Sequence, residues 1–155
     1  MIERIIIGAE GSSQPIQLDE AELVAGKGIV GDKNFAKDKW PGQNVTLIEA
    51  EEIERFNTAY GLSFSPGSLR RNLVTRGVRL TELVGMHFTI GNVQFFGVEL
   101  CEPCASLGNK LATTDMTAAE VVKALTHRAG LRADVVSDGF LSVGMPLLRN
   151  AQACG

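Results

Sequence analysis

The sequence has few cysteines, no long apolar run and no excess of basic residues. Its 155 residues include 15 Lys and Arg against 18 Asp and Glu, so the formal net charge is -3. Nucleic-acid-binding surfaces need clustered Lys and Arg, so this acidic balance argues against a nucleic-acid partner. The N-terminal apolar run, residues 5–7, is far shorter than a signal-peptide core or a membrane-spanning helix. We expect a cytoplasmic protein without a membrane partner.

The small number of cysteines also limits the architecture. Three thiols in a chain that is 45% hydrophobic indicate a core built by apolar packing rather than by a disulfide framework. The length suits one compact unit, which we place at residues 1–148. Residues 149–155 show no periodicity and are expected to form a loose C-terminal tail. The oligomeric state does not follow from the sequence.

Short apolar runs between turns predict a mainly β fold of the α+β class. Seventeen glycines separate these runs, and glycine is typical of tight turns between strands, so a barrel or a sandwich is expected. Residues 87–90 and 93–100 flank Gly91-Asn92, a dipeptide suited to a two-residue turn, which predicts a hairpin. The other predicted strands are residues 5–7, 45–48, 72–74, 133–136 and 140–143.

Two helices are predicted among the strands. Residues 50–60 have a helix-forming composition and are followed by Gly61, a typical C-terminal stop. In the second helix, Thr117 and Glu120 form a capping-box pattern, and apolar residues follow at helical spacing until Ala129-Gly130. His127-Arg128 would then complement the dipole at the end of this helix.

The most informative motif is Cys101-Glu102-Pro103-Cys104, which follows the apolar strand that ends at Leu100. A strand end holds a side chain rigidly while its tip faces a cleft, and neighbouring N–H groups can favour a thiolate. The alternative is that both cysteines pack as small core residues, as free cysteines often do.

Three chemistries compete for these thiols. Disulfide exchange fits the spacing, but thioredoxin-like motifs belong to an early βαβ unit, whereas this motif lies late in a strand-rich chain. Structural zinc needs four ligands, and His87, His127 and Cys154 show no second knuckle spacing. A thiolate could instead ligate molybdenum or another soft metal whose other ligands come from a bound cofactor. The spacing alone does not choose between these chemistries.

The segment Arg70-Arg71-Asn72, with Arg76 after the strand, has an anion-binding composition. Guanidinium groups match phosphate oxygens, and an Asn side chain offers both a donor and an acceptor to a polar ring system. A solvated, charged strand edge is the alternative. Residues 28–32 form a glycine-rich turn without the signature of a P-loop or a dinucleotide-binding motif, so a structural turn is the default.

Taken in order, these segments resemble the MOSC family, which is related to the C-terminal part of molybdenum cofactor sulfurases. The matching segments are a Gly-x-x-Gly-Asp turn, Arg-x-Asn-Leu-Val-x-x-Gly, Gly-x-x-Phe-x-Ile-Gly-x-Val and Pro-Cys-x-x-Leu, at residues 28–32, 70–77, 85–93 and 103–107. With residues 127–133 the resemblance covers nearly the whole chain. The sequence departs from the family pattern at Gly144-Met145-Pro146, where many members read Gly-Asp before their final strand.

The resemblance implies a MOSC-type β-barrel with a few peripheral helices. It also implies a bound molybdenum cofactor, Mo-molybdopterin, with Cys104 as the metal ligand and the catalytic centre. Arg70 and Asn72 would contact the pterin or its phosphate, and Arg71, where the family varies, is a further cofactor-binding candidate. Cys101 matches a position that some relatives share.

The resemblance points to two activities, reduction of N-hydroxylated compounds and transfer of sulfur or cofactor. The chain has no flavin, haem or iron–sulfur motif, so a reductase would draw electrons from a separate donor protein. Whether the protein is an enzyme stays open. The alternatives are a molybdenum cofactor carrier without turnover, and a thiol redox protein that uses Cys101 and Cys104 without metal. The sequence identifies neither a substrate nor an electron donor.

Overall fold

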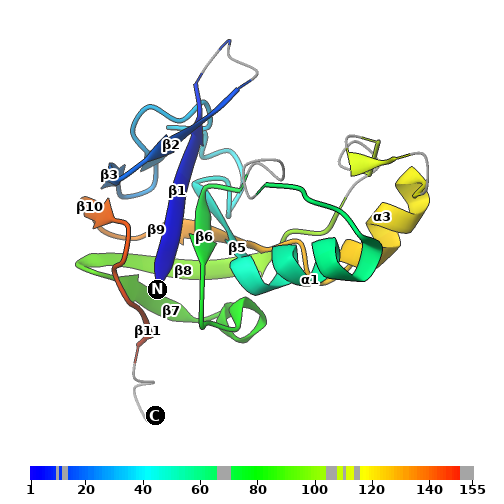
Figure 1. The fold of residues 1–155 in the computed structure, drawn as a ribbon. Helices are drawn as coiled ribbons and strands as arrows, with labels where there is room; N and C mark the ends of the chain where they lie inside the picture. Colours follow the sequence, from blue (N-terminus) through cyan, green and yellow to red (C-terminus); the bar gives the residue numbers. More distant parts are fainter. Residues whose placement is uncertain are drawn as a thin grey trace.

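Strands dominate the fold (Figure 1). The structure, a computed structural model, describes residues 1–9, 11, 14–65, 71–103, 108–109, 111–113 and 116–150. Its strands are β1 (Ile2–Gly8), β2 (Pro15–Leu18), β3 (Glu20–Val24), β4 (Gly28–Ile29), β5 (Val45–Glu49), β6 (Leu73–Thr75), β7 (His87–Ile90), β8 (Val93–Leu100), β9 (Leu131–Val135), β10 (Gly139–Ser142) and β11 (Leu147–Arg149). Its helices are α1 (Ala50–Tyr60), the short 3-10 helix η2 (Leu80–Leu83) and α3 (Ala118–Leu125).

The strands form two sheets. An eight-stranded sheet in the order β11-β7-β8-β9-β5-β6-β1-β2 curls into a half-barrel, and β10-β3-β4 form a three-stranded sheet. The pair β5–β6 is parallel, with Leu47 opposite Leu73, and α1 makes the crossover between these two strands. The other pairs are antiparallel. The predicted mainly β, barrel-like fold is therefore confirmed.

The central strands carry apolar side chains on both of their faces. Successive residues point to opposite faces of a strand. Leu47 and Leu73 accordingly join a cluster between the sheets, whereas Ile48 and Val74 join a second cluster under the helices. Figure 1 shows α1 and α3 together on one side of the sheet. This double burial explains why the central strands read as continuous apolar runs rather than as alternating ones.

The predicted local signals are confirmed at both helices and at the hairpin. The Thr117 hydroxyl accepts a hydrogen bond from the Glu120 N–H at 3.2 Å, and the Glu120 carboxylate accepts one from the Thr117 N–H at 3.3 Å. Helix α1 ends at Gly61, which adopts a left-handed conformation with φ 64°. Strands β7 and β8 pair across the Gly91 turn, with Ile90 opposite Val93.

The predicted end of the second helix is wrong. Helix α3 stops at Leu125, because Thr126 has a ψ of 127° and His127 takes a positive φ of 63°. His127 and Arg128 therefore lie in the connection between α3 and β9 rather than on the last helical turn. Lys123 is the basic residue in that turn.

Four strands were not predicted, namely β2, β3, β4 and β11. Strand β11 includes Arg149, which pairs with Phe88, so regular structure extends into the segment predicted to be a loose tail. The turn at residues 144–146 is tied to β1, because the Gly144 N–H donates to the Ile2 carbonyl at 2.7 Å. Residues 151–155, with Cys154, lie outside the described residues. Within the described part, every helix is too short or too polar to cross a lipid bilayer.

The connection from α3 to β9 passes very close to β5. Gly130 has a φ of 114°, and a Cβ atom at this position would lie 2.1 Å from the Leu47 carbonyl oxygen. Only glycine allows this approach without moving backbone atoms. The same glycine accepts a hydrogen bond from the Cys101 N–H at 2.7 Å, so it also fixes the end of β8.

We expect Gly130→Ala to lower the free energy of unfolding by at least ~2 kcal/mol, because strain from the positive φ adds to a clash with Leu47. Gly61→Ala is the matched control, since Gly61 also has a positive φ but a Cβ added there would meet no atom within 4 Å. It should cost about 1 kcal/mol. Urea unfolding curves measure both changes, and equal losses would show that the contact with Leu47 is unimportant.

Candidate functional site

The predicted site residues fall into two groups. Cys104, the predicted metal ligand and catalytic residue, and Arg70 lie outside the described residues. Arg71 and Asn72 are described and immediately precede β6, and Cys101 immediately follows β8. The structure therefore describes the part of each motif next to Arg70 and Cys104, but not these two residues themselves.

Asn72 is a buried polar residue whose side chain is fully used within the protein. Its Oδ1 accepts hydrogen bonds from the Thr46 N–H at 3.1 Å and from the Thr46 hydroxyl at 3.2 Å. Its Nδ2 donates to the Ile6 carbonyl at 3.1 Å and to Asp32 Oδ1 at 3.4 Å. A carboxamide offers two donor hydrogens and two acceptor lone pairs, so all four positions have partners. Asn72 therefore cross-links β1, β5 and the turn at residues 28–32.

Asp32 makes the glycine-rich turn part of the same network. Its Oδ1 also accepts a hydrogen bond from the Gly8 N–H at 2.9 Å, and its Oδ2 accepts one from the Asn34 N–H at 3.2 Å. Asp32 is buried and thereby closes the turn against the end of β1. The structure thus brings together two of the segments that the sequence analysis singled out, residues 28–32 and the Arg71-Asn72 pair.

Arg71 points toward the other motif. Its Nε donates a hydrogen bond to the Ala129 carbonyl at 2.8 Å, and its guanidinium acts electrostatically on the Cys101 thiol. Residues 71, 101 and 129 come from three distant parts of the sequence, and β-sheet pairing brings them together at one end of β8. Arg71, a candidate cofactor-binding residue, therefore lies near Cys101, the first residue of the motif that contains Cys104.

Cys101 is a core residue. Only 1% of its surface is exposed, and it packs in the cluster under α1 and α3. Burial raises the pKa of its thiol, and the guanidinium groups of Arg71 and Arg132 offset this only in part. A buried thiol with a raised pKa is a poor nucleophile and a poor metal ligand. No cluster of three or more metal-ligating side chains is found among the described residues.

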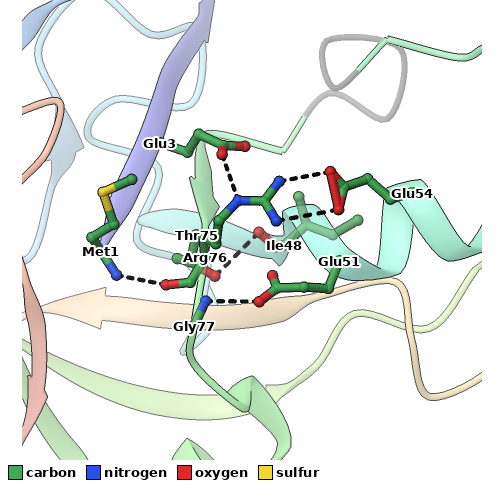
Figure 2. Close-up of polar contacts among 8 residues, drawn as sticks. All are labelled: Met1, Glu3, Ile48, Glu51, Glu54, Thr75, Arg76 and Gly77. Carbon is green, nitrogen blue, oxygen red and sulfur yellow. Dashed lines mark hydrogen bonds and ion pairs between the residues drawn. The ribbon is translucent and has the colours of Figure 1, made fainter.

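Arg76, the third arginine of the segment, belongs to a separate ion-pair network (Figure 2). Its guanidinium contacts Glu3 at 2.6 Å and Glu54 at 2.7 Å, which joins β1 to α1. Beside it, the Gly77 N–H donates to Glu51 Oε2 at 2.7 Å. With two carboxylates already on Arg76, the anion-binding interpretation does not extend to this residue.

A polar cleft that the sequence did not predict lies beside the Cys101 segment. It has a volume of about 250 Å³ and is lined by Glu49, Glu52, Arg79, Thr81, Thr126, His127 and Arg128. Burial raises the pKa of Glu49, and the carboxylates of Glu52 and Glu51 raise it further, whereas the backbone hydrogen bond from Leu80 and the charge of Arg79 lower it in part. The lining residues come from three separate segments, residues 49–52, 79–81 and 126–128, so no spacing in the sequence could have identified them together.

His127 links this cleft to the cysteine motif. Its backbone N–H donates to Glu102 Oε1 at 3.1 Å, and its Nδ1 lies 3.4 Å from Glu102 Oε2. Glu102 stands between the two cysteines in the sequence. The positive φ of His127, uncommon for a residue with a side chain, is thus held by a contact with the motif.

Solved structures share this fold. The YuaD protein from Bacillus subtilis matches with a TM-score of 0.81 at 18% sequence identity, over 98% of this chain and 100% of that chain. YiiM from Geobacillus stearothermophilus matches with a TM-score of 0.73 at 16% identity, over 100% of this chain and 78% of that chain. YiiM from Escherichia coli matches with a TM-score of 0.67 at 19% identity, over 98% and 71%. No curated protein sequence matches the chain.

The curled half-barrel with helices on one face defines a small β-barrel-like domain. In this domain the turn that contains Asp32 is hydrogen-bonded to Asn72, just before β6. The family model described as "MOSC domain" matches residues 32–147. The chain therefore belongs to the MOSC domain family, which is associated with molybdenum cofactor binding. The resemblance seen in the sequence is confirmed.

We expect Asn72→Ala to lower the free energy of unfolding by roughly 3 kcal/mol or more, because it removes the hydrogen bonds to the Thr46 N–H and the Ile6 carbonyl and one of the two donors to Asp32 Oδ1. The exposed Asn92 in the turn between β7 and β8 provides a control, and Asn92→Ala should cost less than about 1 kcal/mol. Denaturant unfolding measures both. If Asn72→Ala lowered the free energy of unfolding no more than Asn92→Ala, the cross-linking role of Asn72 would be contradicted.

The raised pKa of Cys101 predicts a loss of stability at alkaline pH. An unfolded thiol ionises near pH 8.5, whereas the folded chain resists ionisation, so the unfolded state gains as pH rises above about 8.5. In a protein whose only thiol is Cys101, made by Cys104→Ser and Cys154→Ser, the unfolding free energy should fall more steeply above this pH than after a further Cys101→Ala substitution. Iodoacetamide should label this thiol slowly until urea unfolds the chain. Rapid labelling of the folded protein would show that the thiol is accessible.

Proposed function

We propose that this protein binds molybdenum cofactor, with the Cys104 thiolate as the protein ligand of the metal. The observation that carries the proposal is the meeting of three motif segments of a MOSC domain. Asn72 bonds to Asp32 at 3.4 Å, and its neighbour Arg71 acts on the thiol of Cys101, which opens the Cys-x-x-Cys motif. This arrangement suits an anionic cofactor held next to a soft metal ligand.

The described residues fit the cofactor with one change of role. Arg71 is half-buried, is held by the Ala129 carbonyl and carries a full positive charge, as a group that binds a phosphate or a thiolate should. The carboxamide of Asn72 is already satisfied by protein groups. In our proposal, Arg70 and Arg71 hold the anionic end of the cofactor, and Asn72 is a positioning residue that fixes Arg71 and the Asp32 turn.

The two cysteines of the motif have different roles in this proposal. Cys101 packs in the core, and its raised pKa disfavours the thiolate that a metal requires. Its N–H bond to the Gly130 carbonyl anchors the strand end. Cys101 therefore fixes the start of the motif, and the ligand role falls to Cys104.

When bound, the cofactor supplies a redox-active molybdenum that exchanges an oxygen or a sulfur atom with a substrate. The finer proposal is reduction of N-hydroxylated compounds or transfer of sulfur or cofactor. A reductase of this kind needs a separate electron-donor protein. The chain itself binds and orients the cofactor through Cys104, Arg70 and Arg71.

The proposal is tested by the molybdenum and pterin content of protein purified from cofactor-replete cells. We expect near-stoichiometric metal in the unchanged protein and its loss in Cys104→Ser, because serine is a poor ligand for a soft metal. Cys154→Ser, which removes a thiol 50 positions further along the sequence, should retain the metal. Arg71→Ala should weaken pterin binding by about tenfold and so lower the pterin content, as expected for one lost charge-assisted contact. Neither metal nor pterin in the unchanged protein would refute the proposal.

A second assay separates the enzyme from the alternatives. The loaded protein is given a competent electron donor and an N-hydroxylated compound, and the reduced product is measured. Turnover that is lost in Cys104→Ser supports a reductase. Full cofactor content without turnover supports transfer or carriage of the cofactor. A reversible disulfide in metal-free protein, unaffected by Arg70→Ala, would favour thiol redox chemistry instead.

A further inference from the structure

The polar cleft beside the Cys101 segment has the features of a binding site for a small ligand. It lies where the start of α1, the residues around η2 and the connection from α3 to β9 meet. Its volume of about 250 Å³ is below the range of about 300–1,000 Å³ for pockets that take drug-sized molecules. The cleft therefore suits a ligand of few heavy atoms.

The charged side chains in the cleft are only partly paired. Glu52 and Arg128 form an ion pair at 3.3 Å, with both side chains less than half exposed. In the described part of the chain, Glu49 Oε2 accepts a hydrogen bond from the Leu80 N–H at 3.2 Å, and no hydrogen bond or ion pair is found for the Arg79 guanidinium. Glu49 and Arg79 thus face the same cleft and attract each other electrostatically, but in the described part of the chain no hydrogen bond or ion pair joins them.

The balance of charge restricts the chemistry of the ligand. A simple anion in the cleft would meet Glu49 and Glu52, and a simple cation would meet Arg79 and Arg128. A ligand that carries both charges satisfies Glu49 and Arg79 together. We propose that the cleft binds a small zwitterion of the α-amino acid class, with its ammonium group on Glu49 and its carboxylate group on Arg79 and His127.

The surroundings of Glu49 support this orientation. Burial and the neighbouring carboxylates of Glu52 and Glu51 outweigh the Leu80 hydrogen bond and the charge of Arg79, so the pKa of Glu49 is raised in the free protein. An ammonium group beside Glu49 would compensate the negative charge of its carboxylate. The hydroxyl groups of Thr81 and Thr126, also in the lining, can bond to a carboxylate or to a polar side chain of the ligand.

The proposal is tested by titrating the ¹⁵N-labelled full chain with the common L-α-amino acids, one at a time, and following the backbone amide signals of Thr81 and His127. We expect at least one amino acid to shift both signals in a saturable way. Arg79→Gln and Glu49→Gln should each weaken its binding by about tenfold, because each removes one charge-assisted contact. Glutamine at position 49 keeps an acceptor for the Leu80 N–H, so the fold is preserved.

Two control variants and two ligand derivatives complete the test. Arg55→Gln removes a guanidinium that lines the adjacent groove between α1 and α3, and Glu22→Gln removes an exposed carboxylate on β3. Both should leave the affinity unchanged. The N-acetyl and methyl ester derivatives of the bound amino acid lack the cation and the anion, respectively, and should each bind about tenfold more weakly. The proposal is overturned if no amino acid binds, if either derivative binds as well as its parent, or if Arg79→Gln binds like the unchanged protein. None of these outcomes depends on molybdenum.

Discussion

The carboxamide of Asn72 is the interaction on which the arrangement of the site depends. It stands where the parallel pair β5–β6 meets the antiparallel pair β1–β6, and it bonds to both neighbouring strands and to Asp32. A buried amide must find partners for all its polar atoms or lose the free energy of its hydration. All four hydrogen bonds of the Asn72 side chain form only when β1, β5 and the turn at residues 28–32 are in one particular register. Arg71, the preceding residue, is positioned by the same arrangement.

The central strands pack against a hydrophobic cluster on each of their two faces. Side chains between the sheets form one core, and those under α1 and α3 form a second, which includes Cys101. Strand β8 packs against the first cluster through Phe95 and Leu100, and Cys101, just beyond the end of the strand, joins the second. The Cys-x-x-Cys motif thus begins at Cys101, a buried residue that packs in the core. Such support would suit the ligand position proposed for Cys104.

The sequence allowed prediction of features that depend on neighbouring residues, such as the capping box at Thr117, the hairpin at Gly91 and the mainly β class. It did not reveal β2 and β11, which are edge strands with mostly exposed side chains and little apolar pattern. Asn72 was recognised, but its structural role was not, because its partners lie 26, 40 and 66 positions away. The end of α3 was misplaced because His127 is held by Glu102, a contact that no local signal encodes.

The position of β9 has a consequence for biosynthesis. This strand pairs with β5 on one side and with β8 on the other, yet a ribosome makes it after both. Until residues 131–135 emerge, the nascent chain displays two strands that are rich in apolar side chains and have unpaired edges. Such edges readily pair with other chains. The interval before β9 emerges is therefore the one in which the edges of β5 and β8 are most open to pairing with other chains.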